Sequence, residues 1–457
     1  MKTSRLLLVC TQLVCALLVC ALVATGANPG QSAAAHPAAP DSHGPSVLED
    51  APSEEDTRFW EHWTESVDLS QSPLEKATWP AWGITADGQT LYLAWSDGRD
   101  ASQNIYYAKS SDGGESWASA QRVWETSLDS LRPDVVVPGT TAILSWAERT
   151  LYPHHEVYEM ALEAGSPVLV PNDRTGLAYV SHLALGPGGE LHLALQGGTK
   201  SQPDILYSRR DAEATTWPTA TVVFTHTASG SFNPALAVSD SGTVHLMWQE
   251  NSFTDSTIHT MRGQSSGPDI AWGSPITLSA GITSSVRPAV ALGIGTVVYV
   301  AWGEKAPDLK NQYVRFARSE DGGATWSDPE RIDPERFSVN SVAPTDVAPS
   351  LVVAPSGTVC VAWHGFRPGA QVQAEEIYVT CSADQGKNWP DPVNVSRSPG
   401  IISLRPVVAV GSGGILHLAW QEYVAKPEND PRYHYQIYYA HSMPYTLYLP
   451  TIQRSHP

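Results

Sequence analysis

The apolar residues of this chain fall into short stretches that alternate loosely with polar positions and are separated by turns rich in Gly, Pro and Asp. From about residue 75 onward these stretches form a long internal repeat. Each copy has an apolar strand that often begins near a Pro, a Gly-containing turn, a strand that ends in Trp and usually an acid, a variable loop, and a strand of the type Ile-Tyr-Tyr-Ala. This pattern predicts short β-strands in sheets that are covered on both faces.

The Trp at the end of the second strand marks the register of the repeat. Its spacing is roughly fifty residues, the period of a propeller blade made of four short strands. The seven markers, with a Leu in the third copy, are Trp95, Trp146, Leu195, Trp248, Trp302, Trp363 and Trp420. The sequence therefore predicts an all-β fold, a seven-bladed β-propeller, with a six-bladed ring as the alternative.

Three copies also carry the eight-residue pattern S-x-D-x-G-x-x-W. Its residue types suit a tight turn, because Gly reaches positive φ and the Ser and Asp side chains bond to nearby backbone N–H groups. The fixed positions are Ser110, Asp112, Gly114, Trp117, Ser319, Asp321, Gly323, Trp326, Ser382, Asp384, Gly386 and Trp389. The pattern resembles the Asp-box, or BNR repeat, of sialidase-type β-propellers. That resemblance implies a structural role for the boxes, on the face of the ring away from the catalytic site.

The two ends of the repeat indicate how the ring closes. Residues 63–73 (WTESVDLSQSP) match residues 389–399 (WPDPVNVSRSP) position for position, and the latter end the sixth copy. The seventh copy lacks an Asp-box and a clear fourth strand of its own. We therefore expect residues 63–70 to complete the last blade, so that no sheet edge remains exposed.

The segments outside the repeat indicate export. Residues 1–27 have a basic start, an apolar run and small residues for cleavage, as in a secretory signal; an uncleaved anchor is the alternative. Residues 28–58 are rich in Ala, Pro and Ser and predict a disordered linker, the propeller is expected over 59–446, and a tail follows over 447–457. We expect a secreted or extracellular protein, or a cell-surface one if the anchor is kept.

Charge and motifs narrow the classes of partner. The chain has 28 Lys and Arg against 47 Asp and Glu, a net charge of −19, which disfavours nucleic acid and anionic membrane surfaces. No metal-binding, phosphate-loop or serine-hydrolase motif is present. We expect no cofactor, no metal, no membrane insertion beyond the signal segment, and a monomer that binds a glycan or an extracellular protein.

Acids and arginines are predicted to share the face opposite the Asp-boxes. Acids follow the marker Trp in five copies, and three copies have an Arg-Pro pair at the start of the first strand, which lies at the same end of an antiparallel hairpin. The predicted ligand-binding rim is Asp97, Arg132, Glu148, Glu250, Arg287, Glu304, Arg405 and Glu422. The arginines suit a carboxylate clamp like the sialidase arginine triad. The alternative, which the pattern favours, is an ion pair between each Arg and the Glu of its own blade.

The sialidase resemblance is incomplete at its catalytic positions. The family begins its first blade with Phe/Tyr-Arg-Ile-Pro, and Thr78 stands here where that Arg is required. Gly98-Arg99 matches a later Gly-Arg, and Asp100 follows immediately rather than at the spacing of the family's acid. Candidate catalytic residues are Arg99, Asp100, Arg287 and Arg405. We predict a glycan- or protein-binding module without a complete sialidase set; the alternative is an exo-α-sialidase-type glycoside hydrolase with a divergent arginine triad.

Two further groups of residues have predicted structural roles. His192, His245 and His417 occupy one equivalent position on three different blades, which predicts a half-buried packing position rather than a metal site. Cys360 and Cys381 flank a loop symmetrically on neighbouring antiparallel strands, so they are expected to lie opposite each other and form a disulfide. The long loops 305–312, 364–376 and 422–436 are expected to carry ligand specificity.

Overall fold

A computed structural model describes the repeat region of the chain. The chain divides into two units, Met1–Ser53 and Glu54–Pro457, and all described residues belong to the second. They are residues 59–443 except 74–75, 101, 152–153, 164, 175–176, 200–201, 226–229, 252–254, 267–268, 283, 306–311, 334–346, 366–374 and 425–433. The predicted signal segment, the linker and the tail therefore lie outside the described residues. In the part that is described, no helix is long and apolar enough to cross a bilayer.

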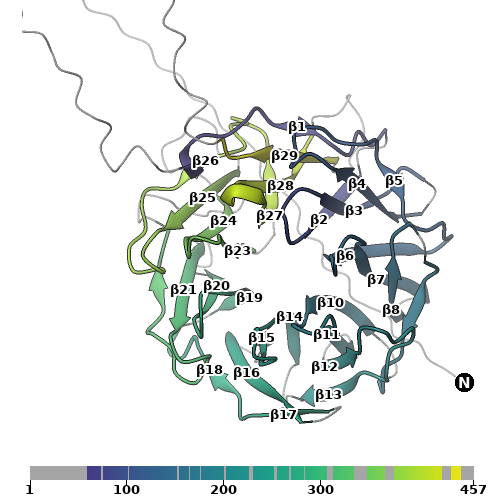
Figure 1. Cartoon of the computed structure of the whole chain (residues 1–457), viewed down its shortest axis with the longest axis vertical. Helices are drawn as coiled ribbons and strands as arrows, with labels where there is room; N and C mark the ends of the chain where they lie inside the picture. The colour runs from purple at the N-terminus through teal and green to yellow at the C-terminus, as the bar shows by residue number, and fades with distance from the viewer. Residues whose placement is uncertain are drawn as a thin grey trace, which may run out of the picture. The chain divides into compact units, whose positions relative to one another are not determined.

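Seven antiparallel blades form a ring, and in the first six of them the chain runs from the centre outward (Figure 1). The first three blades contain β2 (Ala77–Ile84), β3 (Leu91–Asp97), β4 (Asn104–Ser110) and β5 (Gln121–Arg122); β6 (Asp129–Val136), β7 (Ile143–Leu151), β8 (His154–Ala161) and β9 (Val168–Val170); and β10 (Leu177–Leu185), β11 (Leu191–Gly198), β12 (Pro203–Arg210) and β13 (Thr221–Phe224).

The fourth blade contains five strands and the others four. Blade 4 has β14 (Ser231–Val238), β15 (Val244–Asn251), β16 (Ser256–Ser266), β17 (Asp269–Trp272) and β18 (Ile276–Thr277), and blade 5 has β19 (Ser285–Leu292), β20 (Val298–Lys305), β21 (Gln312–Ser319) and β22 (Glu330–Arg331). Blade 6 has β23 (Ser350–Val353), β24 (Val359–Gly365), β25 (Glu376–Ser382) and β26 (Val393–Asn394), and blade 7 has β27 (Ser403–Val410), β28 (Leu416–Tyr423), β29 (Tyr435–His441) and β1 (Val67–Asp68).

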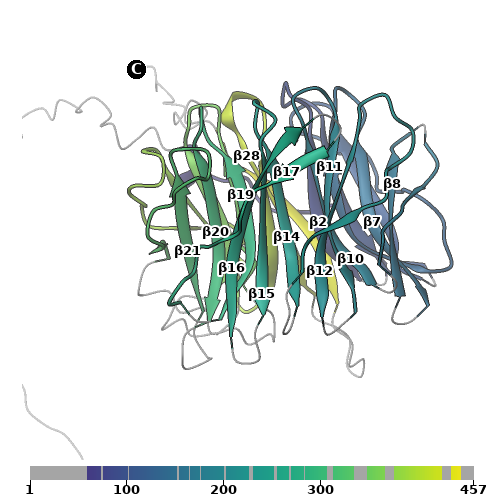
Figure 2. The ribbon, with the colours of Figure 1, turned by 90° about the horizontal axis from the view of Figure 1, so that it is seen from below.

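The prediction of seven blades is confirmed, and the six-bladed alternative is wrong. Blades 2 and 3 share one continuous sheet only because Leu177 of β10 makes a single parallel bridge to His155 of β8. The first strands of successive blades contact one another around the whole circle, from β2 through β6, β10, β14, β19, β23 and β27 back to β2. The strands run between the two faces of the ring (Figure 2).

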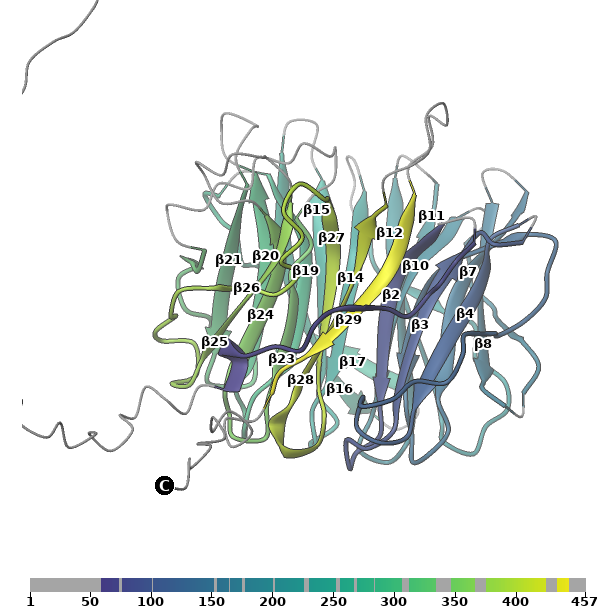
Figure 3. The same ribbon diagram turned by 90° about the horizontal axis from the view of Figure 1, so that it is seen from above.

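The N-terminal strand closes the ring, as predicted. β1 pairs antiparallel with β29, with Val67 opposite Tyr439, and Trp63 bridges to Ser442 (Figure 3). Ser70 extends the closure, because its hydroxyl donates to Gln436 Oε1 at 2.6 Å while accepting from the backbone N–H of Ile437. Blade 7 is therefore built from both ends of the propeller.

The core of the ring lies between adjacent blades, and the marker tryptophans form much of it. The six marker Trp residues are among the largest fully buried side chains, with exposed fractions of 1% or less. The second strand of each blade is buried along nearly its whole length, on both faces, because each sheet packs against two others. The near-continuous burial explains why the apolar alternation of these strands is loose.

Each Asp-box is a turn whose polar groups are satisfied within the box. Ser110 Oγ donates to Asp112 Oδ1 at 2.8 Å and accepts from Gly114 N at 2.9 Å, and the boxes at Ser319 and Ser382 repeat both bonds. Gly114 has a φ of +91° and touches the preceding blade so closely that a Cβ would lie 2.1 Å from the Tyr439 hydroxyl. The box therefore requires Gly here, both for its backbone conformation and for inter-blade contact.

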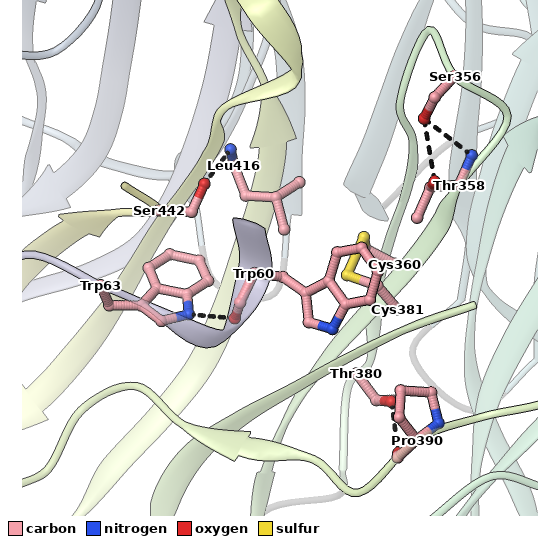
Figure 4. The surroundings of a disulfide bond; sticks show 10 residues. All are labelled: Trp60, Trp63, Ser356, Thr358, Cys360, Thr380, Cys381, Pro390, Leu416 and Ser442. Carbon is pink, nitrogen blue, oxygen red and sulfur yellow. Dashed lines mark hydrogen bonds between the residues drawn. A yellow bond between two sulfur atoms is a disulfide. The ribbon is translucent and has the colours of Figure 1, made fainter. Parts of the chain in front are cut away.

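Cys360 and Cys381 form the predicted disulfide. The two residues are a directly opposed pair on β24 and β25, with their Cα atoms 4.1 Å apart. Both are fully buried, in the same cluster as Trp60 and Trp63, and Trp60 lies next to the disulfide (Figure 4). Trp60 belongs to the short helix η2 (Phe59–Glu61), so the disulfide and the N-terminal segment stabilise the same interface between blades 6 and 7.

Candidate functional site

The Asp-boxes and the arginines lie on opposite faces of the ring. Gly113 of the first box donates its N–H to Gln89 O in the turn between β2 and β3, and Gly322 of the second donates to Thr296 O in the equivalent turn of blade 5. The boxes therefore share a face with the turns between first and second strands. The Arg-Pro pairs lie near the opposite ends of the first strands, β6, β19 and β27. Most of the long loops that were expected to carry specificity lie outside the described residues.

A β-bulge at the start of the innermost strand recurs in six of the blades. The pairing register shifts at the residue before the Pro or its equivalent, for instance between Leu404 and Val407 in blade 7. In five blades a residue other than Gly has a left-handed backbone at this position, with φ between 49° and 60°. These residues are Trp79, Arg132, Asn233, Arg287 and Arg405. A bulge interrupts the alternation of side chains between the two faces of a strand, and it therefore changes the direction in which the side chain of the bulged residue points.

The bulged residues of four blades meet around the indole of Trp79. The guanidinium carbon of Arg405 lies 3.5 Å from the centre of the Trp79 ring, that of Arg132 lies 4.1 Å away, and that of Arg287 lies 6.0 Å away. Arg132 also stacks on Tyr179 of β10, at 4.4 Å. We call Trp79, Arg132, Arg287 and Arg405 the channel cluster. Cations over an aromatic face are attracted by the negative potential of the ring.

Burial and charge repulsion perturb Arg132 of the channel cluster. Desolvation, together with the positive charge of Arg287 and opposed by Tyr179, lowers the pKa of Arg132 to about 10. The Nε atom of Arg132 is buried and makes no hydrogen bond in the described part of the chain. The repulsion between Arg132 and Arg287 is a cost that a bound anion would relieve.

A cavity of about 280 Å³ lies in the central channel beside this cluster. Trp79, Arg405 and His182 line it together with Ser350 and a ring of prolines and apolar residues. These other lining residues are Pro80, Pro234, Ala235, Pro288, Ala289, Val290, Ala348, Pro349, Ser350, Leu351, Pro406 and Val407. A few polar groups converging on a mostly apolar hollow are typical of a ligand site.

The favoured sequence interpretation, an ion pair between each Arg and the Glu of its own blade, is wrong. None of Glu148, Glu304 and Glu422 lies within ion-pair distance of the Arg of its blade; Glu304 instead pairs with Arg315. The reason is the bulge. Glu422 is opposite Ser403, and the register then shifts, so that Arg405 leaves the face on which Glu422 lies.

The predicted rim acids are buried and fix the marker tryptophans instead. Their exposed fractions are all 8% or less, for Asp97, Glu148, Glu250, Glu304 and Glu422. In four blades the acid accepts a hydrogen bond from the indole N–H of the marker Trp two residues earlier, for instance from Trp420 to Glu422 at 2.9 Å. Burial raises the pKa of Glu422, and these hydrogen bonds oppose the rise.

Three of these acids also join one blade to the next. Asp97 accepts from Ser72 Oγ at 2.7 Å, Glu148 from Thr126 Oγ1 at 3.0 Å and Glu422 from Ser398 Oγ at 2.8 Å. Each hydroxyl belongs to the segment that leaves the preceding blade. The acids thus hold the ring together, while the arginines reach the channel.

Arg99 and Asp100 lie apart from the channel cluster. Arg99 donates to Asp97 Oδ2 and to the Ser70 carbonyl, both at 2.6 Å, and stacks on Tyr106. Asp100 accepts from Tyr106 and Arg122. The arginines that lie at Trp79 are Arg132, Arg287 and Arg405, the three that the sequence offered as a carboxylate clamp. The role of any of these residues in catalysis stays a prediction.

The three equivalent histidines are more deeply buried than expected, with exposed fractions of 2% or less. His192 and His417 each contact a Tyr hydroxyl through Nδ1, at 2.5 and 2.9 Å. Burial lowers the pKa of all three; together with the charge of Arg262 it lowers that of His245 to about 4, and together with His441 it lowers that of His417 to about 3. A packing role is consistent with this, and no group of His, Cys, Asp and Glu able to hold a metal occurs among the described residues.

The sequence reasoning missed three residues of the channel, Trp79, Tyr179 and His182. A signal was available, because Trp79-Pro80 and Asn233-Pro234 repeat the X-Pro pair of the three Arg-Pro copies. Comparing all copies at that position would have placed Trp79 among the arginines. Tyr179 and His182 belong to the one blade whose first strand has Val instead of Pro there, and nothing in the repeat identifies them.

Comparisons with known proteins agree with this architecture. The family model described as "BNR repeat-like domain" matches residues 189–396. A search of curated protein sequences finds no match. Among solved structures, a leech intramolecular trans-sialidase is 13% identical with a TM-score of 0.48, covering 83% of this chain and 70% of its own. The NanB sialidase of Streptococcus pneumoniae is 12% identical with a TM-score of 0.46, covering 86% and 73%. An ulvan lyase of polysaccharide lyase family PL25 is 10% identical with a TM-score of 0.57, covering 82% and 94%, a likeness of fold alone.

Proposed function

Since the chain is a BNR-repeat, sialidase-like β-propeller, we propose that it is a secreted binding protein for a glycan bearing a carboxylate, without a complete sialidase catalytic set. The observation that carries this proposal is the channel cluster, in which three guanidinium groups surround the Trp79 indole beside a cavity. Guanidinium groups bind carboxylates through short, charge-assisted bonds. An indole offers an apolar face on which a sugar ring can pack.

Charge and redox chemistry support the extracellular part of the proposal. The Cys360–Cys381 disulfide fits an oxidising compartment. The chain carries a net charge of −19, so the cationic channel cluster is an exception on a molecule that otherwise repels anions. Such a contrast favours one acidic group directed into the channel over a long polyanion lying across the surface.

Hydrolysis of exo-sialidase type has less support than binding. Thr78 stands at the position of the first-blade Arg, and its neighbour Trp79 lies among the arginines instead. Arg99 and Asp100 are engaged with other groups. Incubation with a fluorogenic sialoside tests the alternative directly; turnover that is lost in Arg287→Ala and Arg405→Ala would favour it over the proposal.

Calorimetric titration with matched oligosaccharides tests the binding proposal. The ligands are glucuronate-terminated and glucose-terminated chains of equal length. We expect binding of the acidic ligand only, weakened roughly 10- to 100-fold in Arg405→Ala, because a bond to a charged group contributes about 1.5–3 kcal/mol. Arg405→Lys should also bind weakly, because the ammonium lacks the planar fork that stacks and bonds bidentately.

Arg122→Ala is the matched control, since it removes one positive charge from the outer part of blade 1. It should bind like the unaltered protein. Equal affinity for the acidic and neutral ligands, or equal losses in Arg405→Ala and Arg122→Ala, would contradict the proposal. Binding of an extracellular protein that is unaffected by the Arg405 variants would place function elsewhere on the ring.

A further inference from the structure

The channel cavity contains one side chain suited to proton transfer. Among the described residues that line it, the polar groups are the indole of Trp79, the guanidinium of Arg405, the hydroxyl of Ser350 and the imidazole of His182; all others are Pro, Ala, Val or Leu. Ser350 Oγ accepts from the backbone N–H of Val408. Imidazole is the side chain best suited to accept a proton near neutral pH.

His182 lies beside a carboxylate. Its Nδ1 lies 3.8 Å from Asp134 Oδ2, on the neighbouring innermost strand β6, and its side chain is 40% exposed. Asp134 is itself fixed, because Oδ2 accepts from Leu183 N at 2.6 Å and Oδ1 from Val135 N at 3.0 Å. At this separation Nδ1 makes no hydrogen bond within the described residues. A closer approach of the carboxylate when a ligand binds would set the tautomer and leave the other nitrogen to act as a base.

One base and one guanidinium group that line the same cavity suit a particular reaction class. Hydrolysis of a glycoside by the usual scheme requires two carboxyl groups flanking the bond, and the described lining of this cavity contains none. Removal of a proton from the carbon next to a carboxylate requires only a base and a positive group that stabilises the charge developing on that carboxylate. His182 and Arg405 line the same cavity and match these two needs.

We propose that His182 is the general base of a β-elimination that cleaves a chain at a uronate bound in the channel; this rests on the proposed binding of a carboxylate there. His182 takes the proton from the carbon next to the carboxylate, and the electron pair of that C–H bond becomes a carbon–carbon double bond. The bond from the neighbouring carbon to the glycosidic oxygen breaks, and its electron pair leaves on the oxygen, which takes up a proton from water. His182 then loses its proton to solvent, so the products are an unsaturated uronate and a free hydroxyl.

Ultraviolet absorbance of the new conjugated double bond measures this reaction. The full-length protein is incubated with polygalacturonate, a mannuronate–guluronate polymer and a glucuronate-containing polysaccharide, each alongside its carboxyl-reduced form. We expect elimination from at least one acidic polymer and from no reduced one. In His182→Gln the rate should fall at least about 100-fold, the usual contribution of a general base, while the titrated affinity for a uronate ligand stays the same.

His154→Gln is the matched control, because His154 is exposed at the start of β8 and does not line the cavity. It should leave the rate unchanged. Asp134→Asn tests the positioning of the imidazole: it should lower the rate and shift its pH profile without weakening binding. Uronate binding with no elimination from any polymer would overturn this inference and leave the binding proposal standing. Elimination that persists in His182→Gln would overturn the assignment of the base, and absence of uronate binding would overturn both proposals.

Discussion

Buried neutral histidines should make the stability of the propeller fall steeply in mild acid. His245 and His417 are 2% and 1% exposed, and burial lowers their pKa values from 6.5 to about 4 and about 3. Between those values and 6.5 the unfolded chain binds protons that the folded chain excludes. The free energy of unfolding therefore falls as pH falls through this window, and is regained as pH rises above 6.5.

The size of the effect follows from the pKa differences. Each unit of pKa below the unfolded value costs about 1.4 kcal/mol once the pH has fallen that far. A pH of about 5 lies roughly one and a half units below the unfolded pKa of each histidine. Each one should therefore lower the free energy of unfolding by about 2 kcal/mol relative to neutral pH. Together the two should cost about 4 kcal/mol, a large part of the 5–15 kcal/mol of a typical domain.

Urea unfolding at about pH 7.5 and about pH 5 measures this difference. His417→Asn keeps a polar atom near the position of Nδ1, which contacts the Tyr439 hydroxyl, but cannot titrate. The variant should reduce the pH dependence by about 2 kcal/mol, whatever its stability at neutral pH, and the double variant with His245→Asn should reduce it by about 4 kcal/mol.

Other groups are common to all variants and cancel in this comparison. Burial raises the pKa values of Glu159, Asp333 and Glu422, which opposes the histidine effect, while the Asp-box carboxylates have lowered values and titrate below the window. Exposed His154 supplies the control, and His154→Asn should keep the full dependence. If the double variant retained the slope of the unaltered protein, the reasoning that these histidines are neutral and buried would be refuted.

Three further predictions concern the ring itself. Replacing both Cys360 and Cys381 by Ala should lower the free energy of unfolding by about 3 kcal/mol, which is the entropy that a disulfide closing a loop of this length removes from the unfolded chain. Urea unfolding under oxidising conditions measures this difference, and an unchanged midpoint would contradict the prediction. Trp63→Ala should lower the free energy of unfolding by about 3–5 kcal/mol and speed limited proteolysis of the N-terminal segment, because Trp63 is 2% exposed in the cluster at the ring closure. Trp124→Ala, at an exposed Trp, should have neither effect. Gly386→Ala should destabilise the protein more than Gly322→Ala. Both glycines have positive φ, which costs about 1–2 kcal/mol for Ala, but only at Gly386 would the added Cβ lie 2.5 Å from Phe316. Equal melting temperatures of the two variants would show that the contact between blades is unimportant there.

The fold could be predicted from the sequence because a propeller repeats its information. Any single blade is ambiguous, but seven copies share the marker position, and the match between residues 63–73 and 389–399 specifies the closure. The disulfide followed from the symmetry of Cys360 and Cys381 about one loop. These are properties of register and period, which a sequence displays directly.

The channel cluster could not be predicted in the same way, because its geometry depends on a departure from regular strand structure. In an unbulged hairpin Arg405 would lie one diagonal step from Glu422, as expected, and the ion pair would form. The bulge and the left-handed backbone at Arg405 move the side chain to the channel, and neither has a clear signature in one copy. Only Asn233, a residue type that tolerates left-handed φ, hints at the conformation that its counterparts in the other blades adopt.

The cost of that conformation is itself an argument about function. Five positions before a Pro have left-handed φ in residues with a Cβ, and each costs about 1–2 kcal/mol relative to right-handed backbone. The steric preference of a residue before Pro for extended backbone adds to this. Gly would relieve the strain at every one of them, and the chain uses 35 glycines elsewhere, yet these five positions hold Trp, Asn and three Arg. Strain of this kind persists where the side chain that it positions is needed. Four of the five strained side chains meet at Trp79 beside the cavity, and this convergence is why we propose that the propeller binds its ligand in the channel.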